Sequence, residues 1–562
     1  MRFVVSPVPA TLEVRALYSE RAQEWVREWL AVARDADGEP VFDALEEIIQ
    51  VVSYQEAIAT SDSVMNVTPT GDFDVIAEWV ASLVESTDAE LSTGVHGNGE
   101  PSKSQVLSSL SFAGETAERQ DEEELINTFL STANVDKALL PETSFVIGRK
   151  GTGKTAIFRK LAGEAGALVV TSPPGMETHR QWTPDGNFYS SVADELGKRK
   201  MEWREAWPAI ISLAILQHIP HVPKPQWLPF SVGEAANKGQ YRQSDFIQDL
   251  RAALEHRDAS LLTVEWLEQI DQFLTSPHLL LFDHLDAGFG NTAADRRRRN
   301  DGVAGLLTTA GSLAPQFQHI KFKILLREDI WREVIVPNKS HLEALAVRLN
   351  WSNKIDYLRI AIKQAWRSEP FRDLVSGRLD KENFKLQETA IEYWPEDFVR
   401  AAWVILAGDR VAGGRAAYTD NWVWSRLADA NGDHSPRALA QLFTEAINRE
   451  RDFERGKSYY SKSIIRPPAL VKSLDSVSTQ ALDALKTDEF PELLPVFDAL
   501  TAIGATPFPA HQLETPPHLT ALAREVGLLQ TVNNNSPRDI ANKFRVPELY
   551  RKALGMTRKG QA

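Results

Sequence analysis

The stretch FVIGRKGTGKT, residues 145–155, decides the fold of this chain. An apolar run over 145–147 leads into GRKGTGKT (148–155), which matches the pattern G-x-x-x-x-G-K-[ST], and a helix-like segment follows over 156–162. A strand, a glycine-rich loop and a helix in this order are what a phosphate-binding P-loop requires. Glycines let successive backbone N–H groups point at phosphate oxygens, and the positive end of the helix dipole adds to the attraction.

We therefore expect a nucleotide to bind along this loop, with ATP and Mg²⁺ as the cofactors. Lys154 is expected to reach the β- and γ-phosphates, and the Thr155 hydroxyl to ligate Mg²⁺. The alternative, a chance glycine-rich turn, is disfavoured by the strand and helix on either side. The residues expected to contact the nucleotide are Gly148, Arg149, Lys150, Gly151, Thr152, Gly153, Lys154, Thr155 and Ala156.

The second functional landmark is HLLLFDHLD, residues 278–286. A largely aliphatic run that ends in an acid is typical of a buried parallel strand that carries a carboxylate to its C-terminal edge. Asp283 is expected to bind Mg²⁺ together with Thr155, and Asp286 to accept a proton from the attacking water or to orient that water. The alternative is an ordinary core strand that ends at a polar turn.

Two further strands are predicted, over 167–171 and over 320–327, and the second of them ends in Arg327. An arginine at this sheet edge could neutralise charge near the γ-phosphate, which would give Arg327 a catalytic role. The alternative is an arginine paired with Glu328 or Asp329. The run Arg296–Arg299 is predicted to lie in a polar loop, either solvated or in contact with phosphate.

Composition narrows the class of protein. A chain of 562 residues with 43% hydrophobic and 25% charged residues suggests three or four soluble globular domains. The absence of cysteine excludes disulfides, iron–sulfur clusters and thiol catalysis. The N-terminus lacks the apolar core of a signal peptide, and no apolar run reaches the ~20 residues that span a bilayer. We expect a cytoplasmic protein without membrane contact.

Charge is unevenly distributed along the chain. Residues 1–143 carry 27 acidic and 8 basic side chains, whereas residues 531–562 carry 7 basic and 2 acidic ones. Two surfaces with different partners would explain this asymmetry, and solvated faces are the alternative. We expect a protein partner at the acidic N-terminal domain and, if nucleic acid is bound at all, a DNA contact through the basic C-terminal tail.

The pattern along the chain predicts an α/β fold with four domains. These are a small acidic N-terminal domain (1–112) with a linker near 91–109, a P-loop NTPase core with a parallel sheet flanked by helices (113–335), a helical domain (336–457) and a C-terminal domain (458–562). In the N-terminal domain an opening strand is predicted over 2–5, and helices are predicted over 14–33, 42–54 and 74–84. A helix is expected to begin at Ser435-Pro436, because serine is a common N-cap and proline suits the first turn.

The motifs GRKGTGKT, LLLFDHLD, KILLREDIW, LNW and SPRAL, in this order, resemble the bacterial STAND-like and initiator-like P-loop ATPases of the AAA-related division, several of which are coded in phage-defence loci. The resemblance covers roughly residues 117–455. It implies that 336–457 is a lid and that Arg437 contacts the γ-phosphate from the lid helix. Residues 460–562 are similar to a winged-helix domain. The chain has Asp-His-Leu-Asp where standard members have adjacent Asp-Glu, which favours a slow switch over fast hydrolysis.

The resulting hypothesis is a slowly hydrolysing, STAND-like switch ATPase, a sensor or signalling component of phage defence that forms a nucleotide-dependent homo-oligomer. Two alternatives remain open. One is an initiator-like ATPase that binds or remodels DNA, and the other is a non-catalytic scaffold stabilised by nucleotide.

Overall fold

The computed structural model describes most of the chain, in two compact units. The described residues are 2–8, 11–17, 63–67, 101–112, 128–172, 186–219, 221–225, 243–256, 258–285, 293–381, 384–411, 417–454, 463–532 and 543–559. The P-loop unit comprises Glu115–Trp351 and Ser435–Arg437. The helical unit comprises Met1–Gly114, Ser352–His434 and Ala438–Ala562.

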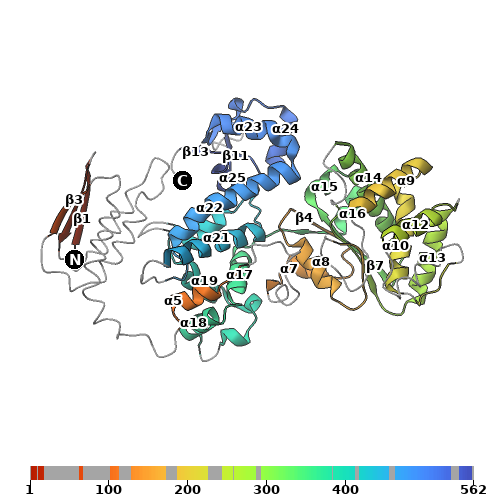
Figure 1. The fold of residues 1–562 in the computed structure, drawn as a ribbon, viewed down its shortest axis with the longest axis horizontal. Helices are drawn as coiled ribbons and strands as arrows, with labels where there is room; N and C mark the ends of the chain where they lie inside the picture. Colours follow the sequence, from red (N-terminus) through yellow and green to blue (C-terminus); the bar gives the residue numbers. More distant parts are fainter. Residues whose placement is uncertain are drawn as a thin grey trace. The chain divides into compact units, whose positions relative to one another are not determined.

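A parallel sheet forms the centre of the P-loop unit (Figure 1). Its strands are β4 (Phe145–Gly148), β5 (Ala167–Thr171), β6 (His278–Phe282), β7 (Ile320–Arg327) and β8 (Ala346–Leu349). They lie in the order β5-β6-β7-β4-β8, and every neighbouring pair is parallel. The strand that leads into the P-loop, β4, therefore has β7 on one side and β8 on the other.

Alternation along the strands buries both faces of the sheet. Phe145 and Ile147 face a large apolar core, whereas Val146 between them joins Ile157 and Phe158 of helix α8. Apolar residues on both faces are the pattern of a parallel sheet covered on each side by helices. On the α8 face lie α7 (Ala133–Leu139) and α8 (Lys154–Ala162). The large core is shared with α9 (Gly186–Arg199), α10 (Trp203–His218), α12 (Gln243–Ala253), α13 (Ala259–Phe273), α14 (Ala293–Leu313), α15 (Glu328–Glu333) and α16 (Lys339–Ala344).

The strands predicted for β4, β5, β6 and β7 are confirmed, and two expectations are corrected. Arg296–Arg299 lie within α14 rather than in a loop, and Arg299 pairs there with Glu333 at 2.8 Å. The sheet also has a strand that was not predicted, β8, so the P-loop unit extends to Trp351, beyond the expected boundary at 335.

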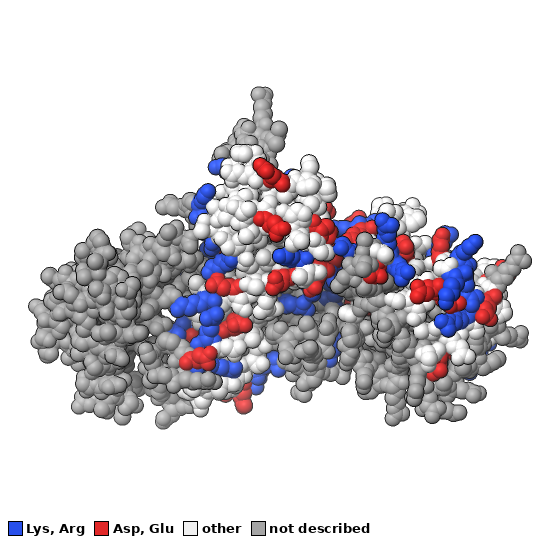
Figure 2. Space-filling model, turned by 45° about the horizontal axis from the view of Figure 1, so that its top comes forward, with Lys and Arg blue, Asp and Glu red and all other residues white. Residues whose placement is uncertain are grey.

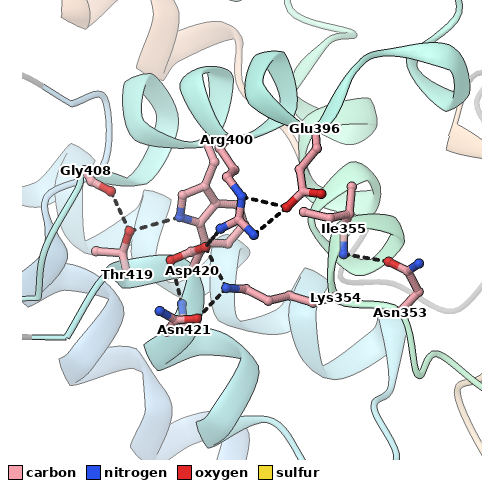
Figure 3. Close-up of polar contacts among 10 residues, drawn as sticks. Asn353, Lys354, Ile355, Glu396, Arg400, Gly408, Thr419, Asp420 and Asn421 are labelled. Atoms are coloured by element: carbon pink, nitrogen blue, oxygen red, sulfur yellow. Dashed lines mark hydrogen bonds and ion pairs between the residues drawn. The ribbon is translucent and has the colours of Figure 1, made fainter.

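The helical unit contains the expected helices beyond the sheet. They are α17 (Lys354–Ala365), α18 (Glu369–Leu379), α19 (Glu396–Ala407), α20 (Thr419–Arg426) and α21 (Pro436–Glu454), with short 3₁₀ turns at Leu386–Glu388 and Ile391–Tyr393. Asp420 joins three of them (Figure 3), because its Oδ2 accepts from Lys354 Nζ at 2.7 Å and from Arg400 Nη1 at 2.6 Å. Beside it, Trp403 Nε1 donates to Thr419 Oγ1 at 2.9 Å.

The last part of the predicted linker forms a helix that packs against the rest of the helical unit. Helix α5 (Lys103–Ser109) begins with a capping box between Ser102 and Gln105. Lys103 Nζ lies 2.7 Å from Oε1 of Glu450, which is fully buried, and Phe112 stacks on Phe443 with ring centroids 4.8 Å apart. Residues 103–112 thus belong to the folded helical unit rather than to a free connection.

The C-terminal part of the helical unit combines helices with a small antiparallel sheet. Its helices are α22 (Pro467–Asp483), α23 (Leu494–Ile503), α24 (Pro517–Glu525) and α25 (Glu548–Arg551), with shorter turns at Ala484–Glu489, Pro491–Leu493 and Ala510–Gln512. Strands β10 (Phe508–Pro509), β11 (Gln530–Val532) and β12 (Lys543–Arg545) form the order β10-β12-β11. Strands β9 (Ala505–Thr506) and β13 (Thr557–Arg558) pair separately in parallel.

At the N-terminus the structure describes only strands. These are β1 (Arg2–Val8), β2 (Thr11–Leu17) and β3 (Ser63–Val67), in the antiparallel order β1-β2-β3. β1 covers the predicted opening strand, whereas β2 occupies the start of the helix predicted over 14–33; the helices predicted over 42–54 and 74–84 lie outside the described residues. Among the described helices, none has the length and apolar composition to cross a bilayer.

Lys323 is a charged side chain in the interior of the P-loop unit. It sits on β7 and is 0% exposed, and its Nζ donates to the carbonyl oxygens of Ala138 and Leu140 at 2.7 Å each. The lysine thereby satisfies carbonyls that the end of helix α7 leaves open. Burial lowers the pKa of Lys323 to about 7, although nearby Glu142 and Glu164 act in the opposite direction.

We predict that Lys323 makes the stability of the protein depend on pH. Between pH 7 and the ordinary lysine pKa of 10.5, the unfolded chain binds a proton that native Lys323 has lost, so the free energy of unfolding rises with pH. One group contributes at most about 1.4 kcal/mol per pH unit. Urea unfolding at pH 7.5, 8.5 and 9.5 should give a steeper rise for wild type than for Lys323→Met.

The matched control for this experiment is Lys321→Met, two residues earlier on the same face of β7 and partly exposed. This variant should keep the pH dependence of wild type. Parallel curves for wild type and Lys323→Met would show that the native lysine keeps its proton.

Candidate functional site

The loop between β4 and α8 has the backbone conformation that phosphate binding needs. Gly151 has φ +82° and Gly153 has φ +102°, and Gly153 is the N-cap residue of α8. Side chains rarely adopt these left-handed conformations, so glycine is required at both positions. An added Cβ at Gly153 would meet no atom within 4 Å, so the space beside it is open.

Two side chains of the motif hold the loop from within. Lys154 is only 8% exposed, and its Nζ donates to the carbonyl oxygens of Gly148 and Arg149 at 2.9 Å each. Thr152 Oγ1 donates to Arg149 O at 2.8 Å. A Cβ at Gly148 would come within 2.5 Å of that hydroxyl, so the first glycine of the motif is also required sterically. The loop therefore surrounds the ammonium group of Lys154.

Asp283 follows β6 directly and is 5% exposed. Two hydrogen bonds join its backbone to the end of β5. Asp283 N donates to Thr171 O at 3.1 Å, and Thr171 Oγ1 donates to Asp283 O at 2.9 Å. Since β7 lies between β6 and β4, two strand spacings of roughly 5 Å each separate the strands that carry Asp283 and the P-loop. His284 follows with φ +59°, and the predicted base Asp286 lies outside the described residues.

Arg327 lies beside the P-loop but is engaged by its own neighbour. Its register partner in β4 is Gly148, the first residue of the motif. Its guanidinium forms two bonds to Asp329, from Nε at 3.1 Å and from Nη2 at 2.7 Å, with both side chains largely buried. The structure therefore shows the ion pair that was one of the two alternatives, and a catalytic role for Arg327 stays a prediction.

Ser435 and Arg437 lie against the P-loop at Gly151. The segment Ser435–Arg437 belongs to the P-loop unit, whereas the residues before and after it belong to the helical unit. Ser435 Oγ donates to Gly151 O at 3.3 Å, and a Cβ at Gly151 would lie 3.0 Å from Cβ of Arg437. Helix α21 begins at Pro436 as predicted. Arg437 is thus placed beside the phosphate-binding loop, although its phosphate contact stays a prediction.

Trp351 is a contact of the P-loop that sequence reasoning did not find. It follows β8, is 9% exposed, and its Nε1 donates to Thr152 O at 3.1 Å. The motif LNW contains this residue, but nothing in the sequence indicates which carbonyl its indole would meet. The pairing depends on β8 lying next to β4, and β8 itself was not predicted.

The residues present fit a nucleoside triphosphate with Mg²⁺. The loop offers left-handed glycines, a central ammonium group and a helix N-terminus, which together suit a chain of phosphates. No cluster of three or more His, Cys, Asp or Glu that could hold a metal exists among the described residues. Mg²⁺ needs none, since it usually takes one or two protein oxygens together with phosphate and water, and Thr155 and Asp283 are the residues that would provide them.

The strand order and the loop geometry identify the fold. This unit has the α/β fold of a P-loop NTPase. No family model matches the chain, and no curated protein matches it in sequence. Solved structures similar to the chain include Cdc6p from Pyrobaculum aerophilum, at 15% identity and a TM-score of 0.25 over 73% of this chain and 86% of that one. They also include a Walker-type ATPase of Pyrococcus abyssi, at 12% identity and a TM-score of 0.32 over 77% of this chain and 95% of that one.

Proposed function

We propose that this protein is an ATP-binding, slowly hydrolysing switch ATPase. The observation that carries the proposal is the P-loop wound around Lys154 with Arg437 packed beside Gly151 in the same compact unit. Lys154 would release the Gly148 and Arg149 carbonyls, or share its three donors with them, to bind the β- and γ-phosphates. Thr155 and Asp283 would hold Mg²⁺, which would neutralise charge on the phosphates.

We propose slow turnover because the residue that follows Asp283 is not a carboxylate. The adjacent position carries His284 in a left-handed conformation, and the next carboxylate in the chain is Asp286. In standard enzymes of the division that the motifs resemble, the adjacent residue is a glutamate. A base placed less directly orients the attacking water less well, which lowers the hydrolysis rate.

The biological role we propose is that of a STAND-like sensor or signalling component, with phage defence as its setting. The support is the resemblance of the motifs and the position of Arg437, which suits an element that reports ATP. In this role ATP would favour one arrangement of the protein, such as a homo-oligomer, and ADP another, since a ligand shifts an equilibrium only through differential affinity.

We predict that Lys154→Ala weakens nucleotide binding at least tenfold, about 1.4 kcal/mol or more. The variant loses the charge that faces the phosphates and also the donors to the Gly148 and Arg149 carbonyls. Calorimetry with ATP·Mg²⁺ measures the change. Lys160→Ala, an exposed lysine further along α8, is the control that should bind as wild type does. Equal affinities for wild type and Lys154→Ala would refute the nucleotide site.

We predict that Arg437→Ala weakens ATP binding more than ADP binding, because the expected target of the guanidinium is the γ-phosphate, which ADP lacks. The same variant should reduce any difference in oligomer size between ATP and ADP, measured by light scattering. Arg449→Ala changes an exposed arginine on the same helix and should leave both affinities unchanged. Equal losses for ATP and ADP in Arg437→Ala would indicate a structural role.

The C-terminal sheet favours a second candidate function, contact with nucleic acid. The order of elements α23, β10, α24, β11 and β12, with β12 central in the sheet, is what a winged helix would show. Alternation along β12 buries Phe544 and exposes Lys543 and Arg545 on one face. Two neighbouring cations on an exposed strand suit a phosphate backbone.

The rest of the basic tail contributes less to this candidate than its charge count suggests. Arg551 Nε lies 2.9 Å from Glu548 Oε2, Arg558 lies 3.7 Å from the other oxygen of Glu548, and Lys552 Nζ lies 2.8 Å from Asp475. Two carboxylates thus offset part of the charge of these three cations within the helical unit. On the face of the molecule that Figure 2 shows, blue and red side chains are interspersed over the described residues.

We predict that any DNA binding depends on β12. Lys543→Ala/Arg545→Ala should weaken binding and reduce the slope of log affinity against log salt by about two, since each phosphate contact contributes about 0.9. Fluorescence anisotropy with a labelled duplex at low and moderate salt, with and without ATP, measures both. Lys385→Ala/Lys472→Ala, two exposed lysines of the same unit, is the control. An unchanged slope in the β12 variant would refute the contact.

A further inference from the structure

Two carbonyl oxygens of the P-loop accept hydrogen bonds that the motif itself does not supply. Backbone carbonyls in a loop need donors, because no regular ladder provides them. The carbonyls of Gly148 and Arg149 accept from Lys154 and Thr152, which belong to the motif. The carbonyls of Gly151 and Thr152 accept from distant parts of the chain.

These two donors are Trp351 and Ser435. Trp351 Nε1 donates to Thr152 O at 3.1 Å, and Ser435 Oγ donates to Gly151 O at 3.3 Å. Both residues belong to the P-loop unit, Trp351 as the last residue before the chain leaves it and Ser435 as the first residue after the chain returns. Two consecutive peptide groups of the loop are therefore held from outside.

Holding a carbonyl also fixes the N–H of the same peptide group, because in a planar trans peptide the two point in opposite directions. The bond from Trp351 to Thr152 O fixes the N–H of Gly153, the N-cap residue of α8. The bond from Ser435 to Gly151 O fixes the N–H of Thr152, which lies 3.3 Å from Arg149 O within the loop. The indole bond thus fixes a peptide group whose N–H lies at the N-terminus of α8, where phosphate is expected to bind.

We propose that Trp351 and Ser435 are positioning residues of the nucleotide site, which hold the Gly151–Gly153 peptides in the phosphate-binding conformation. They contact neither phosphate nor metal and act only through the loop. The inference rests on the proposed function, because it assigns these residues to that nucleotide site. We expect Trp351 to have the larger effect on nucleotide affinity, since its hydrogen bond is the shorter one and its ring is buried.

The consequence that distinguishes this role is equal weakening of ATP and ADP. The N–H groups of the loop serve the β-phosphate, which both nucleotides have, whereas Arg437 is expected to serve only the γ-phosphate. Trp351→Phe keeps an aromatic ring and removes the N–H donor. Loss of one ordinary hydrogen bond should raise the Kd for ATP and for ADP by roughly two- to tenfold. Ser435→Ala should act in the same direction with a smaller effect.

The matched control is Trp403→Phe in the helical unit. This change removes the same kind of bond, from a buried indole Nε1 to Thr419 Oγ1 at 2.9 Å, at a tryptophan that is 1% exposed. It should leave both Kd values at those of wild type, even if it lowers the melting temperature. Calorimetry of the full chain with ATP·Mg²⁺ and ADP·Mg²⁺, together with thermal unfolding of each variant, separates positioning from folding.

The outcomes are distinct. Equal weakening of ATP and ADP in Trp351→Phe, with wild-type affinities in Trp403→Phe, supports the proposal. Wild-type affinities in Trp351→Phe and Ser435→Ala, or an equal loss in Trp403→Phe, overturns it. If Trp351→Phe does not fold, Ser435→Ala decides alone. Absence of nucleotide binding by the wild-type protein would instead refute the proposed function itself.

Discussion

A phosphate-binding loop cannot satisfy its own backbone, and the P-loop unit is organised around this constraint. The carbonyl groups of such a loop lie outside regular secondary structure and need other donors. Lys154 and Thr152 supply those of Gly148 and Arg149 from within the motif, and Ser435 and Trp351 supply those of Gly151 and Thr152. Because the last two donors come from segments far apart in the chain, the conformation of the loop is coupled to the placement of β8 and of the start of α21.

The sheet explains why those segments arrive where they do. β4 lies between β7 and β8, so the residues that follow each strand meet at the same edge as the P-loop. Arg327 ends β7 beside Gly148, and Trp351 follows β8. The packing of both faces allows little variation in this arrangement. The one buried cation, Lys323, is tolerated among the described residues of the sheet because two helix-end carbonyls accept its protons.

The sequence predicted those parts of the fold whose signal is local. Four strands are apolar runs that end at polar residues, and the P-loop is a contiguous motif. β8 was not predicted because it is a short edge strand, and its Arg348 forms ion pairs with Glu328 and Glu343 instead of lying in a core. The start of α14 was not predicted as helix because DRRRR contains no apolar residues at helical spacing. The buried apolar residues of this helix begin only at Val303. Side-chain partners such as Trp351 and Ser435 depend on tertiary contacts, which no local pattern specifies.

The same distinction applies to charge. The seven basic residues of the tail could be counted from the sequence, but their partners could not: Arg551 and Arg558 share Glu548, and Lys552 pairs with Asp475. Net charge therefore overstates the attraction of this segment for phosphate, and the strand face with Lys543 and Arg545 is the part that suits a phosphate contact. By contrast, Lys154 is held in place inside its loop by hydrogen bonds and is only 8% exposed, so its charge acts at a fixed point that solvent screens little. One fixed and buried charge at the P-loop thus says more about function than several exposed or paired ones at the tail.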